Sequence, residues 1–233
     1  MNRTRFENLD EQKKERLLDS AAEEFAEHGY EGASLNKILE RAGMSKSSLY
    51  HYFEDKADLF MSLTERSVAI LMCEIGGFDP QALTAESYWP VLEGRVRRAL
   101  ELSNRNTWYV KLGRMMLRFR SLPKGMDRSN RLYRAARSFV EATLLRGQEL
   151  GVVRTDLPQS LMVDSAMALG EAIDAWMLTH WDDMTPEERL AMVGVNFELF
   201  RRLLAAPSEV SSAASPGGGF RAGRGGREDF KKS

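Results

Sequence analysis

A predicted helix over residues 46–53 carries polar side chains that could read a nucleic acid. Four of them, spaced to share one face, combine a cation, a hydroxyl and two hydrogen-bonding rings: Lys46, Ser47, Tyr50 and His51. Leu49 and Phe53 lie one turn apart on the opposite face and point inward. The outward face lacks the mixed Glu/Lys pattern of an ordinary solvated helix. Such groups suit contacts with base edges and phosphates in a major groove.

The elements around this helix form a predicted helix-turn-helix. A short helix after Ser34, whose hydroxyl can cap it, ends at Gly43, and Ser45 caps the next helix. The glycine permits the sharp reversal between them. Ser34 and Lys56 each stand at a helix N-terminus, where backbone amides and a side-chain donor can meet phosphates. A purely structural alternative, in which the serines only cap and the rings pack locally, leaves the outward polar face unexplained.

The overall charge hides a local contrast. The chain of 233 residues has a net charge of −1, which by itself argues against a nucleic-acid-binding protein. Residues 1–58 hold 9 basic and 13 acidic side chains, yet residues 33–53 hold three basic side chains against Glu40 alone. The predicted reading face is therefore locally basic within an acidic domain.

The remaining sequence predicts an all-α protein. Helical patterning extends from about residue 10 to residue 205, with expected later helices near 86–104, 107–121, 127–150, 158–181 and 186–205. Leu122-Pro123-Lys124-Gly125 is expected to break the chain between two of them. Residues 207–233, rich in Gly, Ser and Arg, are predicted to be a disordered and passive tail rather than an RNA-binding Arg-Gly segment.

The segment EGASLNKILERAGMSKSSLYHYFEDKADLF resembles the DNA-binding domain of the TetR (tetracycline-repressor) family of transcriptional regulators. The resemblance covers about residues 10–65 and departs from the usual pattern at Ser47, where many members have glycine. It implies phosphate contacts for Ser34 and Lys56 and packing between helices for Tyr52. It implies groove and backbone contacts for the following residues: Ser45, Lys46, Ser47, Tyr50 and His51.

The family also implies that residues 66–206 form a helical domain that dimerises through its last two long helices. The sequence alone leaves open whether their apolar stripes meet a partner or an intramolecular bundle; the family favours a homodimer. A helix-interior glycine and neighbouring apolar residues are the interface candidates: Gly170, Ile173, Met177, Phe197, Phe200 and Leu204.

A pocket for a small hydrophobic effector is the other expectation for this domain. Methionine and aromatic walls suit an adaptable site, although each such residue could equally belong to a simple core. The candidates are Trp108, Met115, Phe119, Phe139, Trp176 and His180. Further polar groups that could orient an effector are Arg118, Glu171 and Asp174, of which the acids could also be solvated surface charges.

These observations favour a DNA-binding repressor over two other classes of protein. An enzyme is disfavoured because the three histidines are scattered, no second cysteine joins Cys73 in a metal site, and no serine lies in a nucleophile elbow. A helical ligand-binding module without DNA binding is disfavoured by the polar face of residues 46–53. We therefore expect a cytoplasmic regulator with a DNA operator, a small-molecule effector and a second copy as partners, and with no cofactor, metal or membrane.

Overall fold

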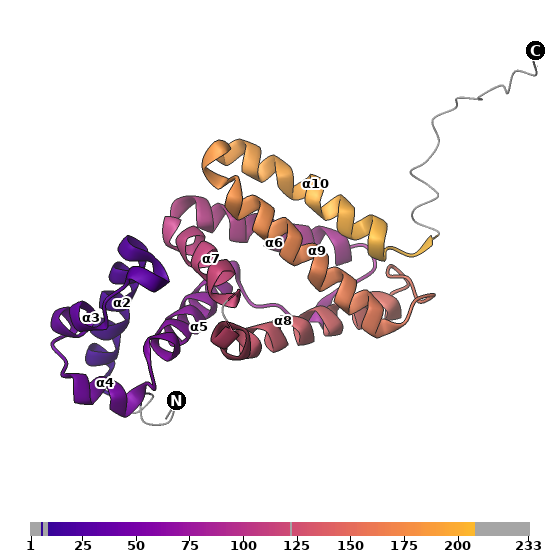
Figure 1. Ribbon diagram of the computed structural model, residues 1–233. Helices are drawn as coiled ribbons and strands as arrows, with labels where there is room; N and C mark the ends of the chain where they lie inside the picture. Colours follow the sequence, from indigo (N-terminus) through magenta and orange to yellow (C-terminus); the bar gives the residue numbers. More distant parts are fainter. Residues whose placement is uncertain (1–5, 7–8, 122, 208–233) are drawn as a thin grey trace, which may run out of the picture.

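The computed structural model describes residue 6, residues 9–121 and residues 123–207, with no side-chain description for 123–130. Nine α-helices and two short 3-10 turns run through this described part (Figure 1). The all-α prediction is confirmed. The helices are α2 (Glu11–Gly32), α3 (Leu35–Ala42), α4 (Lys46–Tyr52), α5 (Lys56–Ile75), α6 (Tyr88–Arg105), α7 (Thr107–Arg120), α8 (Pro123–Glu149), α9 (Gln159–Thr179) and α10 (Pro186–Leu204).

Helices α2, α3 and α4 form a small lobe at one end of the molecule (Figure 1). Its centre is apolar and includes the fully buried side chains of Phe25, Ile38 and Leu49. Gly29 interrupts the helical path of α2 at φ 70°, and Gly43 ends α3 at φ 65°. Both glycines take the left-handed conformation that a side chain disfavours, so these turns depend on residue type.

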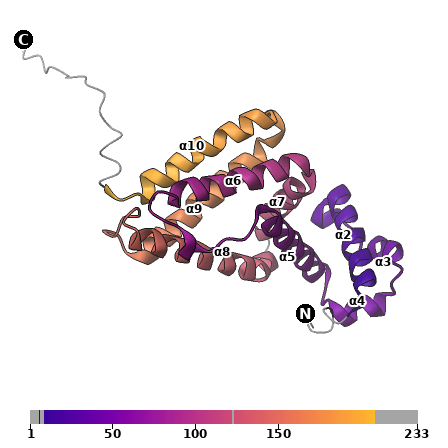
Figure 2. The same cartoon turned by 180° about the vertical axis from the view of Figure 1, so that it is seen from behind.

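The other helices form a bundle in which α9 and α10 lie side by side along one edge (Figure 1, Figure 2). The predicted start of α10 is confirmed, because Thr185 and Glu188 cap each other's backbone N–H groups. The start of α8 was predicted wrongly. Pro123 opens the helix instead of breaking it, since the first turn of a helix needs no N–H from its first residue.

One hydrophobic cluster spans the N-terminal lobe and part of the bundle, and a second cluster lies within the bundle. The sequence suggested a domain boundary between residues 65 and 66. Helix α5 continues across that point without a break. Leu112, Met115 and Phe119 of α7 pack into the same apolar cluster as the side chains of the N-terminal lobe. The predicted tail lies outside the described residues, apart from its first residue. No helix in the described part is long and apolar enough to cross a membrane.

Candidate DNA-binding surface and effector cavity

Helix α4 presents the predicted polar face to solvent. Leu49 is 0% exposed and anchors the helix, whereas Tyr50 is 60% exposed on the other side. The Ser45 hydroxyl accepts a hydrogen bond from the N–H of Ser48 at 3.2 Å, which confirms Ser45 as the cap of this helix. The remaining predicted groove residues are also exposed: Lys46, Ser47 and His51.

Ser34 does not cap α3 with its hydroxyl, as its sequence position suggested it would. Its hydroxyl makes no capping hydrogen bond to α3; instead its backbone N–H donates to Oε1 of Glu24 at 3.0 Å. Glu24 is fully buried and also lies 3.4 Å from a guanidinium nitrogen of Arg41. The hydrogen bond from Ser34 lowers the pKa of Glu24 and keeps the carboxylate charged. Glu24, a residue that sequence reasoning missed, therefore ties α2 to the start of α3.

Lys56 does not present its ammonium group freely to a phosphate. Its Nζ donates to the carbonyl oxygens of Glu31 at 2.9 Å and Ala33 at 3.1 Å. The same nitrogen lies 5.1 Å from the centre of the Tyr30 ring. Burial lowers the pKa of Lys56. These contacts hold the ammonium group at the end of α2, and two of its three N–H donors are used there, so the phosphate contact stays a prediction.

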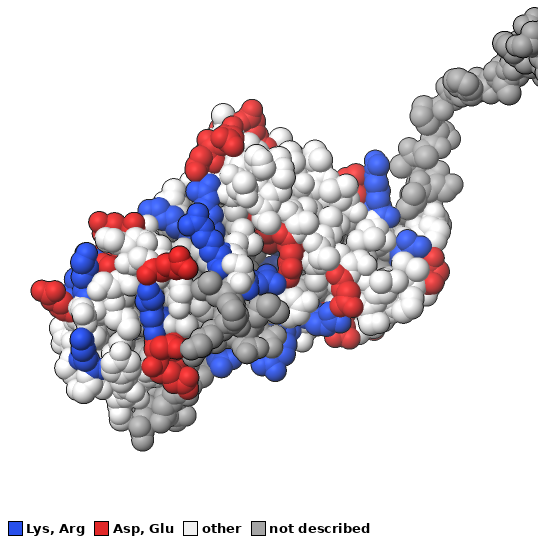
Figure 3. All heavy atoms as spheres, viewed as in Figure 1, with Lys and Arg blue, Asp and Glu red and all other residues white. Residues whose placement is uncertain are grey.

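The charge distribution over the N-terminal lobe is mixed. Figure 3 shows basic and acidic side chains interspersed over this end of the molecule, without a broad basic field. Lys37 on α3 and Lys46 on α4 are exposed, whereas the pairing of Arg41 with Glu24 engages a third cation. On the face drawn, the exposed cations of the lobe thus stand among acidic side chains.

Two adjoining cavities of about 440 and 560 Å³ lie inside the helical bundle. Their walls are mainly apolar and share seven residues, so the two cavities adjoin and are described together as one hollow. The shared residues are Val96, Ala99, Met116, Gly170, Asp174, Phe197 and Phe200. A mainly apolar hollow with few polar groups is typical of a small-molecule site.

Only one of the predicted pocket residues lines this hollow: Phe139 lies in the wall of the larger cavity. Met115 and Phe119 lie instead in the core that α7 shares with the N-terminal lobe. Trp108 packs against the same core and donates from its indole nitrogen to the hydroxyl of Ser67 at 3.1 Å. Met116, one residue along the helix, faces both cavities. The predicted residues of α7 thus pack against the lobe, and Met116 lines the cavities instead.

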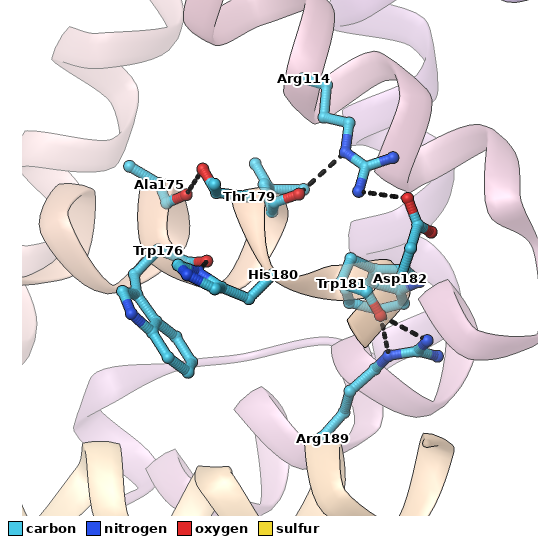
Figure 4. Close-up of polar contacts among 9 residues, drawn as sticks. Arg114, Ala175, Trp176, Thr179, His180, Trp181, Asp182 and Arg189 are labelled. Carbon is cyan, nitrogen blue, oxygen red and sulfur yellow. Dashed lines mark hydrogen bonds and ion pairs between the residues drawn. The ribbon is translucent and has the colours of Figure 1, made fainter. Parts of the chain in front are cut away.

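Trp176 and His180 stack on each other outside the cavity walls, with ring centroids 4.5 Å apart (Figure 4). Nearby, Arg114 donates to the carbonyl of Leu178 at 2.8 Å and pairs with Asp182 at 2.9 Å. These contacts anchor the end of α9 to α7. The assignment of Trp176 and His180 as effector contacts is therefore not supported by their positions.

The six predicted dimer-interface residues all point into their own subunit. Each lines one or both cavities: Gly170, Ile173, Met177, Phe197, Phe200 and Leu204. Other large apolar side chains on α9 and α10 are exposed, with exposed fractions of 45–59%. They are Leu161, Trp176, Val195 and Leu199. The expected pair of helices thus carries a second apolar face, and it is this outer face that is available to a partner.

A short helix with an exposed polar face, joined to its neighbour by a tight turn and mounted on a helical bundle with a cavity, defines a helix-turn-helix regulator. Comparison with known proteins identifies the family. Residues 17–63 match the model of "Bacterial regulatory proteins, tetR family". Over 146 residues the chain is 30% identical to the HTH-type transcriptional repressor AcnR of Corynebacterium diphtheriae, covering 63% of this chain and 70% of that protein. The chain belongs to the TetR family of transcriptional regulators, which are not enzymes.

Solved structures agree on the fold. SmeT, the repressor of the Stenotrophomonas maltophilia multidrug efflux pump SmeDEF, is similar with a TM-score of 0.63 and 19% identity, over 82% of this chain and 89% of that one. FadR of Bacillus subtilis in complex with stearoyl-CoA gives a TM-score of 0.60 at 20% identity, over 80% of this chain and 96% of that one. At this level of identity the likeness is one of fold.

Proposed function

We propose that this protein is a homodimeric cytoplasmic repressor that binds a pseudopalindromic operator and releases it when a small hydrophobic effector fills the cavity. The observation that carries the proposal is the position of α7 between the cavity and the DNA-binding lobe. Met116 and Arg120 of α7 line the cavity. Met115 and Phe119, on the neighbouring face of the same helix, pack into the core of the lobe.

The DNA contacts proposed for each subunit come from the exposed face of α4. Lys46 and His51 supply donors and, with Ser47 and Tyr50, reach base edges and phosphates in one major groove. Ser34 contributes a hydroxyl that is not used in capping, beside the backbone amides at the start of α3. In a dimer the two α4 helices enter successive major grooves, so half-sites lie about 34–36 Å apart.

Dimerisation is proposed through the outer apolar face of α9 and α10. Leu161 and Trp176 on α9 and Val195 and Leu199 on α10 supply its large side chains. A two-fold axis would pair this face with its own copy, giving four helices at the interface. Burial of these side chains removes them from water and fixes the distance between the two α4 helices.

An effector can release the operator only by binding one arrangement of the subunits better than the other. Filling the cavity would displace Met116 or Arg120 and shift α7. Because Phe119 on the same helix contacts the ring of Tyr30 in the N-terminal lobe and the ring of Phe60 on α5, that shift changes the orientation of the lobe. By reciprocity, a bound operator would weaken effector binding by the same factor.

Selection of genomic fragments by the purified full-length protein tests this function. We expect enrichment of a sequence with two-fold symmetry and a mobility shift at a stoichiometry of one dimer per site. A Lys46→Ala, Tyr50→Ala double variant serves as the control, because both side chains are exposed and their removal should leave the fold unchanged. Failure to enrich any sequence, or equal enrichment by the double variant, would contradict the proposed function.

A further inference from the structure

The polar groups in the wall of the cavity are mostly engaged by the protein itself. Arg120 donates to Oε1 of Glu171 at 2.9 Å, and Arg95 donates to the carbonyl oxygens of Gly76 and Gly77 at 3.0 and 3.2 Å. Arg189 is held at 2.6 Å by the carbonyl oxygen of Trp181 (Figure 4). Each of the three cations therefore has a protein acceptor, and Arg120, the one on the same stretch of wall as Glu171, is paired with a carboxylate.

Asp174 is different, because no hydrogen bond or ion pair joins its carboxyl group to another residue in the described part of the chain. It lies on α9 and belongs to the walls of both cavities, at the place where they meet. Its side chain is exposed and borders both cavities. A carboxyl group surrounded by apolar walls lacks the hydration that stabilises its charge.

The surroundings of Asp174 leave space for a ligand and add negative charge. Gly170, one turn earlier on α9, has no side chain, and a Cβ atom there would lie 3.8 Å from the ring of Phe200. Glu171, three residues before Asp174 on the same helix, strengthens the negative potential felt at Asp174. Burial and Glu171 together raise the pKa of Asp174 to about 6, which marks a carboxylate in need of a positive partner.

We propose that the effector is an apolar molecule bearing a protonated amine, and that Asp174 receives this amine at the junction of the two cavities. The inference rests on the proposed function, since it names the class of effector for that cavity. The ammonium group donates hydrogen bonds to the carboxylate, and the ring of Phe200 borders the same space. Apolar parts of the molecule extend into one or both cavities, where Met116 and Phe197 line the walls.

Anionic amphiphiles fit this arrangement poorly. Their charged group would meet the unpaired carboxylate of Asp174 at the junction, where the nearby guanidinium of Arg120 is already paired with Glu171. Neutral amphiphiles would fill the same apolar space but leave the carboxyl group unpaired. The chemistry of the head group is therefore the property that distinguishes ligands of this site.

Three probes with the same chain and different head groups test the inference: decylammonium, 1-decanol and decanoate. Calorimetric titration at pH 7.5 into the full-length protein should give the tightest binding for decylammonium, by about tenfold or more over decanol. The Asp174→Asn variant should lose about tenfold or more in affinity for decylammonium and change little toward decanol. Asp183→Asn, which removes an equal charge from an exposed position outside the cavity walls, should bind all three as the parent protein does.

The inference is overturned if decanoate or decanol binds as tightly as decylammonium, if Asp174→Asn keeps the affinity for decylammonium, or if none of the three binds. A mobility shift without any probe, performed on the same preparations, separates this failure from failure of the proposed function. Operator binding by a protein that ignores the amine would leave the repressor intact and remove only the proposed effector class.

Discussion

Tyr30 at the end of α2 lies edge-on to Phe119 of α7, with ring centroids 4.9 Å apart. Phe60 of α5 packs against both rings, at 5.2 Å from each. The ammonium group of Lys56 lies over the other side of this cluster, 5.1 Å from the Tyr30 ring. These contacts join the DNA-binding lobe to a helix of the cavity wall, so the lobe cannot turn on the bundle without repacking aromatic rings.

Replacement of Phe119 by alanine should strongly destabilise the protein. The side chain is 1% exposed and fills the joint core, so its loss should lower the free energy of unfolding by about 3–5 kcal/mol. Urea denaturation followed by circular dichroism measures this change. Phe139→Ala is the matched control, because that ring lies on the cavity wall and is 44% exposed. Its loss should lower the free energy of unfolding clearly less. Equal losses for the two variants would contradict the role of Phe119 in joining the lobe to the bundle.

Removing the charge of Lys46 should affect operator binding, whereas removing that of Lys56 should affect thermal stability. Lys46→Ala should weaken operator binding and lower the slope of log affinity against log salt by about 1, as removal of one phosphate contact does. Its melting temperature should stay unchanged because the side chain is exposed. Lys56→Met should instead lower the melting temperature, since two carbonyl oxygens at the end of α2 lose their donor.

Paired measurements of salt-dependent mobility shifts and thermal unfolding on both variants check this division. If Lys56→Met kept its melting temperature and lost one unit of salt slope, Lys56 would be a phosphate contact after all. The test also separates the phosphate contact that the family resemblance implies for Lys56 from the structural role that its bonds to two carbonyl oxygens indicate.

Local spacing was enough to predict the exposed face of α4, since Lys46, Ser47, Tyr50 and His51 depend only on helical geometry around the buried Leu49. The structural roles of Lys56 and Glu24 were not predictable in this way. Lys56 bonds to carbonyls 23 and 25 residues away, and Glu24 bonds to the N–H group of a residue in another element. Such contacts arise from the packing of α2 against the later helices, which single-sequence periodicity does not contain.

The bundle showed a different limit of sequence reasoning. Helices α9 and α10 are apolar on two faces, so a stripe such as Gly170, Met177 and Phe197 fits either a cavity wall or a dimer interface. The structure places this stripe inside and leaves Val195 and Leu199 outside. Helical periodicity defines the stripes but does not say which one a partner covers.

The outer face of α9 and α10 gives a prediction about oligomeric state. Leu199→Glu should raise the dimer dissociation constant by at least about 100-fold, because two copies of an unpaired carboxylate would be buried at a two-fold interface. Sedimentation equilibrium measures the constant. Ile70→Glu is the control, since Ile70 is a similarly exposed side chain on α5, at 44% against 46% for Leu199. A dimer that tolerates Leu199→Glu as well as Ile70→Glu would place the interface elsewhere.

Asp174 should make the free protein less stable as the pH rises. Its pKa is about 6 in the folded protein because of burial and the nearby Glu171, against an ordinary value of 3.8. Between these values the folded state holds a proton that the unfolded state has lost, so stability decreases from about pH 4 to pH 6 and the loss is complete above pH 6. Arg120 does not offset this cost at Asp174, because its guanidinium is paired with Glu171 at 2.9 Å.

Thermal unfolding of Asp174→Asn should match that of the parent at pH 4 and occur at a higher temperature at pH 7.5. Asp183→Asn, an exposed control, should show no such gain, and a parent protein that is as stable as Asp174→Asn at pH 7.5 would contradict a desolvated carboxylate in the cavity.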